Sequence, residues 1–266
     1  PEPNSPRYVP PVPHTMLDLF IVLVPYVHGA DAASLFDACM HVLQVDDSGL
    51  QKKAYRALSR LLDGKDAAAL RAHVGCAALV SRYLELDVPP GAVRDRLALF
   101  RTLVPHMPDD DLGTLAALVP EAVLGTKEAN QGAREEAYAL LVDMGHRMAR
   151  GGRINRAQAG TDVQDIVAAS VPEYVMMVAA GLAGASPRMI GASITALARL
   201  LYEFHLALPD DMLAELLTTM LVYLESTNRE IVKASLGFCK VATLSLSPQQ
   251  IEQVLPSLVP ALLQIR

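Results

Sequence analysis

Apolar positions in residues 228–246 recur with the period of an α-helix. Ile231, Ala234, Phe238 and Val241 follow one another at steps of three and four residues, a spacing that places their side chains on one helix face. A second apolar line occupies another side of the same stretch and consists of Val232, Leu236 and Cys239. A surface helix normally carries one apolar stripe. Two apolar sides therefore predict a helix inside a stack, with a neighbour on each side.

The same pattern recurs upstream at intervals typical of helical repeats. Residues 189–194 align with residues 231–236, and three earlier stretches carry similar sequences. The equivalent positions of the five copies are Ala54, Leu97, Ala137, Ser193 and Ser235. Their spacings are 43, 40, 56 and 42 residues, and three of these fall near the period of HEAT and armadillo repeats. The sequence therefore predicts an all-α fold, a HEAT/armadillo-type α-solenoid in which antiparallel helix pairs form a superhelix.

The repeat also suggests how the chain is organised. Residues 1–13 contain six prolines and should form an extended lead-in. Residues 14–266 should form a single solenoid of about five helix pairs and a final helix. The long spacing of 56 residues predicts an insertion, which is visible as the glycine- and arginine-rich run 151–160. Because the chain ends directly after an apolar helix, we expect it to be a piece of a longer protein.

Turn signals between the repeats define most of the helix ends. Residues 66–86 read as one helix, and residues 162–185 as a long helix interrupted near Val171 and Pro172, so that this segment is one helix or two. Asp31 is placed to cap the amino end of an early helix. Three aspartates, Asp109–Asp111, come where another helix begins, and they favour capping and interaction with the helix dipole over cation binding.

Composition limits the classes of function. Hydrophobic residues make up 52 % of the chain, aromatic residues 5 %, and tryptophan is absent, so the core must consist of aliphatic side chains. The net charge of −6 argues against a surface that binds nucleic acid throughout, while a local basic patch is compatible with it. The three cysteines, Cys39, Cys76 and Cys239, are far apart, which indicates buried thiols in a reducing compartment.

The sequence contains no set of convergent polar residues of the kind an enzyme needs. Its seven histidines are scattered, and none pairs with cysteine or glutamate at a metal-ligand spacing. We therefore expect a protein without catalytic activity, metal or cofactor, and without a small-molecule substrate.

Two groups of basic residues are candidates for contact with RNA or a protein partner. The first has four arginines at three-residue steps, Arg147, Arg150, Arg153 and Arg156, and guanidinium groups bind phosphate well. The second lies on the polar side of residues 228–246 and consists of Arg229, Lys233 and Lys240. Cations at a helix carboxyl end and helix solubility explain these groups as well, so both interpretations remain open.

Three stretches resemble the eukaryotic ribosomal RNA-processing protein 12 family, whose members are karyopherin-like HEAT-repeat factors of ribosome assembly. They are LQKKAYRAL (50–58), GTKEANQGAREEAYALLVDMG (125–145) and residues 179–241, which contain LLYEF and NREIVKASLGFCKV. The similarity is strongest over residues 113–266 and recognisable from residue 49. A generic HEAT repeat would not carry the last two strings together. The family members are much longer than this chain.

The resemblance implies a non-enzymatic scaffold of ribosome biogenesis. Such proteins act in pre-rRNA processing, in maturation of the small-subunit precursor and in nuclear export of pre-ribosomal particles. The implied partners are pre-ribosomal RNA, assembly factors and ribosomal proteins, together with the Ran GTPase and nuclear pore components. The implied location is the nucleus and nucleolus, with shuttling to the cytoplasm. The alternative is a generic karyopherin-like transport or adaptor solenoid that binds only proteins, and RNA crosslinking would distinguish the two.

Overall fold

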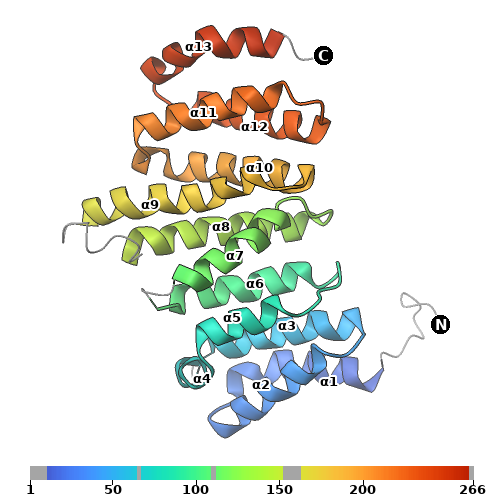
Figure 1. The fold of residues 1–266 in the computed structure, drawn as a ribbon. Coiled ribbons are helices and arrows are strands. Elements are labelled where there is room, and N and C mark those ends of the chain that lie inside the picture. The colour runs from blue at the N-terminus through green and yellow to red at the C-terminus, as the bar shows by residue number, and fades with distance from the viewer. Residues whose placement is uncertain (1–10, 65–66, 109–111, 152–162, 264–266) are drawn as a thin grey trace. The chain divides into compact units, whose positions relative to one another are not determined.

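The computed structural model describes residues 11–64, 67–108, 112–151 and 163–263. All regular elements in these ranges are α- or 3₁₀-helices, and no strand occurs among them. The chain forms two compact units, Pro1–His106 and Met107–Arg266. Each unit is described by itself below, and Figure 1 shows the helices of each unit following one another in chain order.

The first unit is built around α3, which contacts α1, α2 and α6. The elements of this unit are α1 (Val12–Leu23), η1 (Val24–Tyr26), α2 (Ala30–Val42), α3 (Ser48–Asp63), α4 (Ala67–Val74), α5 (Cys76–Leu84), α6 (Val93–Leu103) and η2 (Val104–His106). Helix α3 pairs with α2 and stacks on α6, so that successive pairs cover one another's apolar sides.

The second unit repeats this arrangement with longer helices. Its elements are α7 (Leu112–Gly125), α8 (Gln131–Gly151), α9 (Val163–Ala179), η3 (Ala180–Ala183), α10 (Pro187–Phe204), η4 (His205–Ala207), α11 (Asp210–Leu224), α12 (Arg229–Ser245) and α13 (Pro248–Leu263). The pairs are α7–α8, α9–α10 and α11–α12, and α10 also contacts α8 and α12. Stacked helix pairs of this kind confirm the predicted HEAT/armadillo-type fold, while the continuity of one solenoid over 14–266 stays a prediction.

The repeat register deduced from the sequence is confirmed by burial. The five equivalent positions lie on α3, α6, α8, α10 and α12, and each has an exposed fraction of 0 %. These five positions are Ala54, Leu97, Ala137, Ser193 and Ser235. In α12 the hydroxyl of Ser235 donates to the carbonyl of Ile231 at 3.0 Å, so this buried polar atom has its hydrogen bond within the helix.

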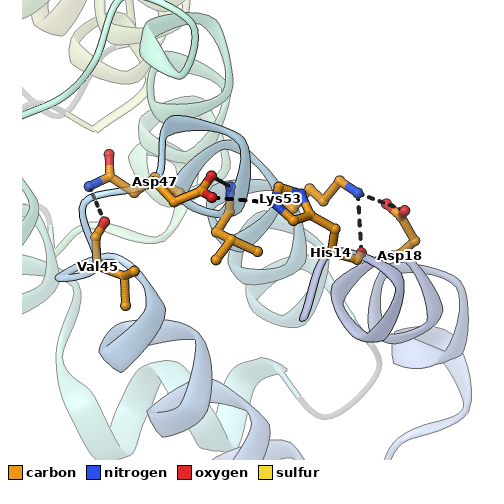
Figure 2. Close-up of polar contacts among 7 residues, drawn as sticks. His14, Asp18, Val45, Asp47 and Lys53 are labelled. Atoms are coloured by element: carbon orange, nitrogen blue, oxygen red, sulfur yellow. Dashed lines mark hydrogen bonds and ion pairs between the residues drawn. The ribbon is translucent and has the colours of Figure 1, made fainter. Parts of the chain in front are cut away.

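A small polar network ties α1 to the start of α3 in the first unit (Figure 2). The Asp47 carboxylate accepts from the backbone N–H of Leu50 at 2.9 Å and therefore caps α3. Its other oxygen lies 3.3 Å from Nε2 of His14. Lys53 donates to the His14 carbonyl at 3.1 Å and to Asp18 at 2.7 Å. Lys53 of α3 is thus joined to two residues of α1 that lie 39 and 35 positions away in the chain.

Three local predictions differ from the structure or are resolved by it. Residues 66–86 do not form one helix, because Gly75 adopts a φ of +81° between α4 and α5, a left-handed conformation that ends a helix. Asp31 lies inside the first turn of α2 and is not its N-cap residue. The N-cap of α2 is Gly29, whose φ is +55°. Helix α9 continues through Pro172. The neighbouring Val171 and Tyr174 are buried, and this packing offsets the cost of a helical proline.

The prediction of two apolar sides on α12 is only partly right. Phe238 and Cys239 are buried, whereas Leu236 is exposed and Val232 is half-buried. Helix α12 packs against α10 and α11, and these two contacts leave part of the second apolar line at the surface.

Candidate functional site

The second unit contains a groove of about 600 Å³ on the side formed by α8, α10 and α12. Each helix contributes lining residues that are one turn apart, such as Arg134 and Tyr138 on α8, or Lys233 and Gly237 on α12. A spacing of four residues puts both side chains on the same helix face. The turn after α7 adds Lys127. Because α8, α10 and α12 are the second helices of consecutive pairs, the repeat itself brings these residues together.

Small side chains form the floor of this groove. Ala198 lies on α10, and Ala234 and Gly237 lie on α12. A Cβ added at Gly237 would meet no atom within 4 Å, so the space above this glycine is open. The groove is therefore deep because alanine and glycine, rather than large side chains, stand between its polar lining residues.

The rim of the groove is cationic. Four of its lining side chains carry a positive charge (Lys127, Arg134, Arg199 and Lys233), and one carries a negative charge (Glu230). The whole chain has a net charge of −6, so this surface has the opposite sign to the molecule around it. A concave surface with one predominant sign concentrates the field and attracts a ligand of opposite charge.

Two arginines are held in place around the rim, and one of them lies against a tyrosine ring. Arg134 donates to the carbonyls of Glu128 and Ala129 at 2.7 and 2.8 Å. On α10, Arg199 donates to Glu203 at 3.1 Å, and its guanidinium carbon lies 5.5 Å from the ring centroid of Tyr202. Side chains held in one orientation lose little entropy when a ligand binds. The Tyr202 side chain is 56 % exposed, so its ring is available at the edge of the groove.

Burial and a neighbouring lysine both act on the ammonium group of Lys127. Burial lowers the pKa of Lys127, and the positive charge of Lys233 acts in the same direction, while Glu230 opposes both. A bound carboxylate or phosphate would favour the charged ammonium group and would raise this pKa. The two lysines thus repel each other in the absence of a ligand, and an anion between them would relieve the repulsion.

A second hollow continues the groove past the amino ends of α10 and α12. It has a volume of about 310 Å³ and shares Lys127 and Glu230 with the first. Arg188, at the start of α10, lines this extension and forms an ion pair with Glu128 at 3.1 Å. The two hollows together form an elongated depression with cations along its length.

The structure separates the residues of the two predicted basic groups. Lys233 lines the groove, whereas Arg229 and Lys240 are exposed on α12 outside its lining. Arg147 is buried in α8 and donates to the carbonyl of Met107 at 2.8 Å. This burial corrects the expectation that Arg147 faces a partner, because its guanidinium is engaged inside the unit. Arg150 lies in the last turn of α8, but its side chain lies outside the described residues, as do Arg153 and Arg156.

Sequence reasoning missed most of the groove. Among its cations only Lys233 belongs to a predicted group. Within the repeat alignment, Arg134 stands three residues before Ala137, and Lys233 stands two before Ser235. Basic residues at nearly equivalent positions of neighbouring copies were therefore the available signal. Arg199 and Tyr202 have no counterpart in the neighbouring copies, and Tyr138 corresponds to Tyr55 of the first copy, which is buried.

Other kinds of site receive no support from the described part of the chain. Within residues 11–64, 67–108, 112–151 and 163–263, no group of three or more His, Cys, Asp or Glu side chains is arranged to hold a metal ion. None of the helices described there has the length and hydropathy that crossing a bilayer requires.

Sequence comparisons find relatives with a consistent name. The chain is 31 % identical over 265 residues to ribosomal RNA-processing protein 12 of Saccharomyces cerevisiae, a match that covers 98 % of this chain and 22 % of the relative. It is 29 % identical over 262 residues to a putative ribosomal RNA-processing protein 12 of Schizosaccharomyces pombe, covering 95 % and 21 %. An RRP12-like protein of Homo sapiens is 33 % identical over 233 residues, covering 86 % and 17 %. The chain thus spans about a fifth of the length of these curated relatives, and no family model matches it.

A comparison of structures agrees on the fold. One solved chain, described under the heading "TOG-tubulin binding specificity promotes microtubule dynamics and mitotic spindle formation", aligns with a TM-score of 0.56 at 13 % identity. The alignment covers 97 % of this chain and 90 % of that chain. At this identity the likeness concerns the arrangement of helix pairs alone.

Proposed function

Because this chain belongs to the ribosomal RNA-processing protein 12 family over the region that it covers, we propose that it is part of a non-enzymatic scaffold in ribosome biogenesis. The observation that carries the proposal is the 31 % identity to the yeast protein over 98 % of this chain. The scaffold acts in pre-rRNA processing, in maturation of the small-subunit precursor and in nuclear export of pre-ribosomal particles. Its location is the nucleus and nucleolus, from which it shuttles to the cytoplasm.

A scaffold role suits stacked helix pairs, because each pair adds surface without the need for a central core. The proposed partners are pre-ribosomal RNA, ribosome assembly factors and ribosomal proteins, and the Ran GTPase and nuclear pore components during export. The groove on α8, α10 and α12 supports this role, since it is a preformed concave surface with anchored arginines and tyrosines. Residues of these two types dominate binding energy at many protein interfaces.

The basic residues outside the groove remain part of the proposal as secondary contacts. Arg229 and Lys240 are exposed on α12 and are placed to meet a partner. Arg150, Arg153 and Arg156 are retained on the basis of their spacing in the sequence. We leave Arg147 out of this set, because it is buried.

The direct test is to deplete the full chain from cells and to follow pre-rRNA intermediates by hybridisation. We expect precursors of the small-subunit rRNA to accumulate, and we expect ultraviolet crosslinking to recover pre-ribosomal RNA with the tagged chain. Unchanged precursor levels after depletion would refute the scaffold role. Normal association with pre-ribosomal particles without any crosslinked RNA would favour an adaptor that binds only proteins.

A second test concerns the three arginines spaced regularly from residue 150. Replacement of Arg150, Arg153 and Arg156 by glutamate should weaken co-sedimentation of the chain with pre-ribosomal particles, because the new charges repel phosphate. Circular dichroism serves as the control for folding and should show unchanged helicity. Co-sedimentation equal to that of the unaltered chain would remove these residues from the proposal.

A further inference from the structure

The groove of the second unit combines two chemical features that few ligands satisfy together. Its rim carries Lys127, Lys233 and two anchored arginines, and its floor is formed by Ala198, Ala234 and Gly237. A purely ionic ligand would leave the apolar floor without contacts, and a purely apolar ligand would bring no negative charge to the cationic rim. The occupant should therefore carry carboxylates or phosphates close to apolar groups.

The charge of the surrounding unit argues against nucleic acid as this occupant. Residues 107–266 contain 12 lysines and arginines and 18 aspartates and glutamates. Nucleic-acid-binding domains are usually basic, because their affinity comes largely from neutralised phosphates. Here the carboxylate of Glu230 also lies in the lining and would repel a phosphate backbone that follows the groove. A short acidic segment places fewer negative charges against the same surface.

A peptide can form favourable contacts with Glu230 and with the apolar floor, whereas a phosphate backbone cannot. Glu230 can accept a backbone N–H of a peptide, and apolar side chains can enter the space above Gly237, where a Cβ would meet no atom within 4 Å. The rings of Tyr138 and Tyr202 flank this floor and provide rigid contact area. The adjoining hollow extends the depression through Lys127, so a segment of several residues has cations along its path.

We propose that this groove binds a short acidic peptide segment of a partner protein, in which apolar side chains alternate with carboxylates. The carboxylates pair with Lys127, Lys233 and Arg199, and the apolar side chains lie on the floor between α10 and α12. This inference names the kind of partner that the scaffold holds at this groove and in that sense rests on the function proposed above. The preformed rim lowers the entropy lost on binding.

The test measures peptide binding to the full chain by fluorescence anisotropy. The probe is a labelled peptide of about ten residues with alternating glutamate and leucine, and a peptide with lysine in place of glutamate is the charge control. A labelled single-stranded oligouridine is measured under the same conditions. We expect the acidic peptide to bind, its affinity to fall as salt rises, and the lysine peptide to show no binding.

Matched charge reversals inside and outside the groove locate the site. Lys233→Glu reverses a charge in the groove and should weaken binding about tenfold. Arg82→Glu reverses the charge of an exposed residue on α5 in the first unit, outside the groove lining, and should change affinity by less than about twofold. Tyr202→Ala should weaken binding about tenfold without altering the charge. Lys233 and Arg82 are exposed, so neither charge reversal should alter the unfolding midpoint.

Each contrary outcome has a defined meaning. Equal losses from Lys233→Glu and Arg82→Glu would overturn the assignment to this groove. Tighter binding of oligouridine than of the acidic peptide, sensitive to Lys233→Glu, would overturn the peptide in favour of RNA. Absence of peptide binding by a chain that still associates with pre-ribosomal particles would overturn this inference alone. Peptide binding by a chain whose depletion leaves pre-rRNA unchanged would overturn the scaffold function alone.

Discussion

Replacement of Phe238 by alanine tests the packing of the second unit most directly. The Phe238 side chain lies on α12 and is 1 % exposed, and α12 packs against α10 and α11. Removal of a buried phenyl ring loses its transfer free energy and leaves a cavity that neighbouring helices fill only in part. Such substitutions cost about 3–5 kcal/mol. We therefore expect Phe238→Ala to lower the free energy of unfolding of the second unit by this amount.

Leu236 provides the matched control two residues earlier on the same helix. Its side chain is 37 % exposed, so truncation to alanine removes less buried area and leaves no enclosed cavity. We expect Leu236→Ala to cost less than about 1.5 kcal/mol, about half the value of a fully buried leucine. Both variants introduce alanine into α12, so the gain in helix propensity acts in the same direction in each.

Urea unfolding followed by far-ultraviolet circular dichroism measures the difference. The slope of free energy against urea should stay the same in both variants, because neither changes the surface exposed on unfolding to a large extent. The midpoint of the transition that includes the second unit should fall much further for Phe238→Ala than for Leu236→Ala. Equal midpoints for these two variants would show that Phe238 does not lie inside the stack and would refute the packing of α12 described above.

Three further perturbations test other parts of the structure. Asp47→Ala should destabilise the first unit by about 1 kcal/mol through loss of the α3 cap, whereas truncation of the exposed Asp46 should have no such effect on the urea midpoint. Arg147→Ala should cost about 1–3 kcal/mol, because the carbonyl of Met107 loses its buried donor, and an unchanged midpoint would contradict this. Burial raises the pKa of the Cys39 thiol from 9.0 to about 11. The thiolate therefore forms more readily in the unfolded chain, so stability that is present below pH 9.0 should fall as pH rises towards about 11, by about 1.4 kcal/mol per pH unit. In a Cys39→Ala variant, measured in parallel, this part of the pH dependence should disappear.

The inside of the fold was predictable because burial repeats with the helix pairs. Ala54 and Ser235 stand at opposite ends of the repeat alignment, yet both are fully buried on second helices of pairs. Packing against neighbours on two sides allows few side chains at such a position, so the same pattern returns in each copy. A periodic constraint of this kind leaves a signal in the amino-acid sequence, and this signal sufficed for the fold class and the order of helices.

Features that depend on one local conformation were not predictable in the same way. Gly75 interrupts an otherwise helical pattern by adopting a positive φ, and a glycine within a helix would look the same in the sequence. The exposure of Leu236 depends on how far α10 and α11 cover α12, which the spacing of apolar residues along α12 does not specify. In both cases the outcome is decided by the backbone or by neighbouring helices, and not by the periodicity of the segment itself.

The candidate site was the least predictable part, because its residues are assembled from different copies of the repeat. Arg134 and Lys233 are 99 positions apart in the chain, and only the stacking of α8, α10 and α12 brings them to one groove. Conversely, the regular spacing of Arg147 with the following arginines suggested a shared surface. The Arg147 guanidinium in fact meets the carbonyl of Met107, 40 positions away. Spacing along a helix indicates which residues share a face, but not whether that face is covered.

This difference between inside and outside also explains how a helical repeat acquires a specific binding site. The buried positions are constrained in every copy, so they maintain the spacing between second helices whatever stands on the open face. The open face is then free to vary from copy to copy, and here it presents arginine and tyrosine on α8 and α10 but lysine and glycine on α12. The groove is cationic at its rim and open above Gly237 because the exposed residues differ between copies, whereas the same positions are buried in each copy. The specificity of such a surface therefore has to be sought in residues that break the repeat, and the periodic ones identify the fold alone.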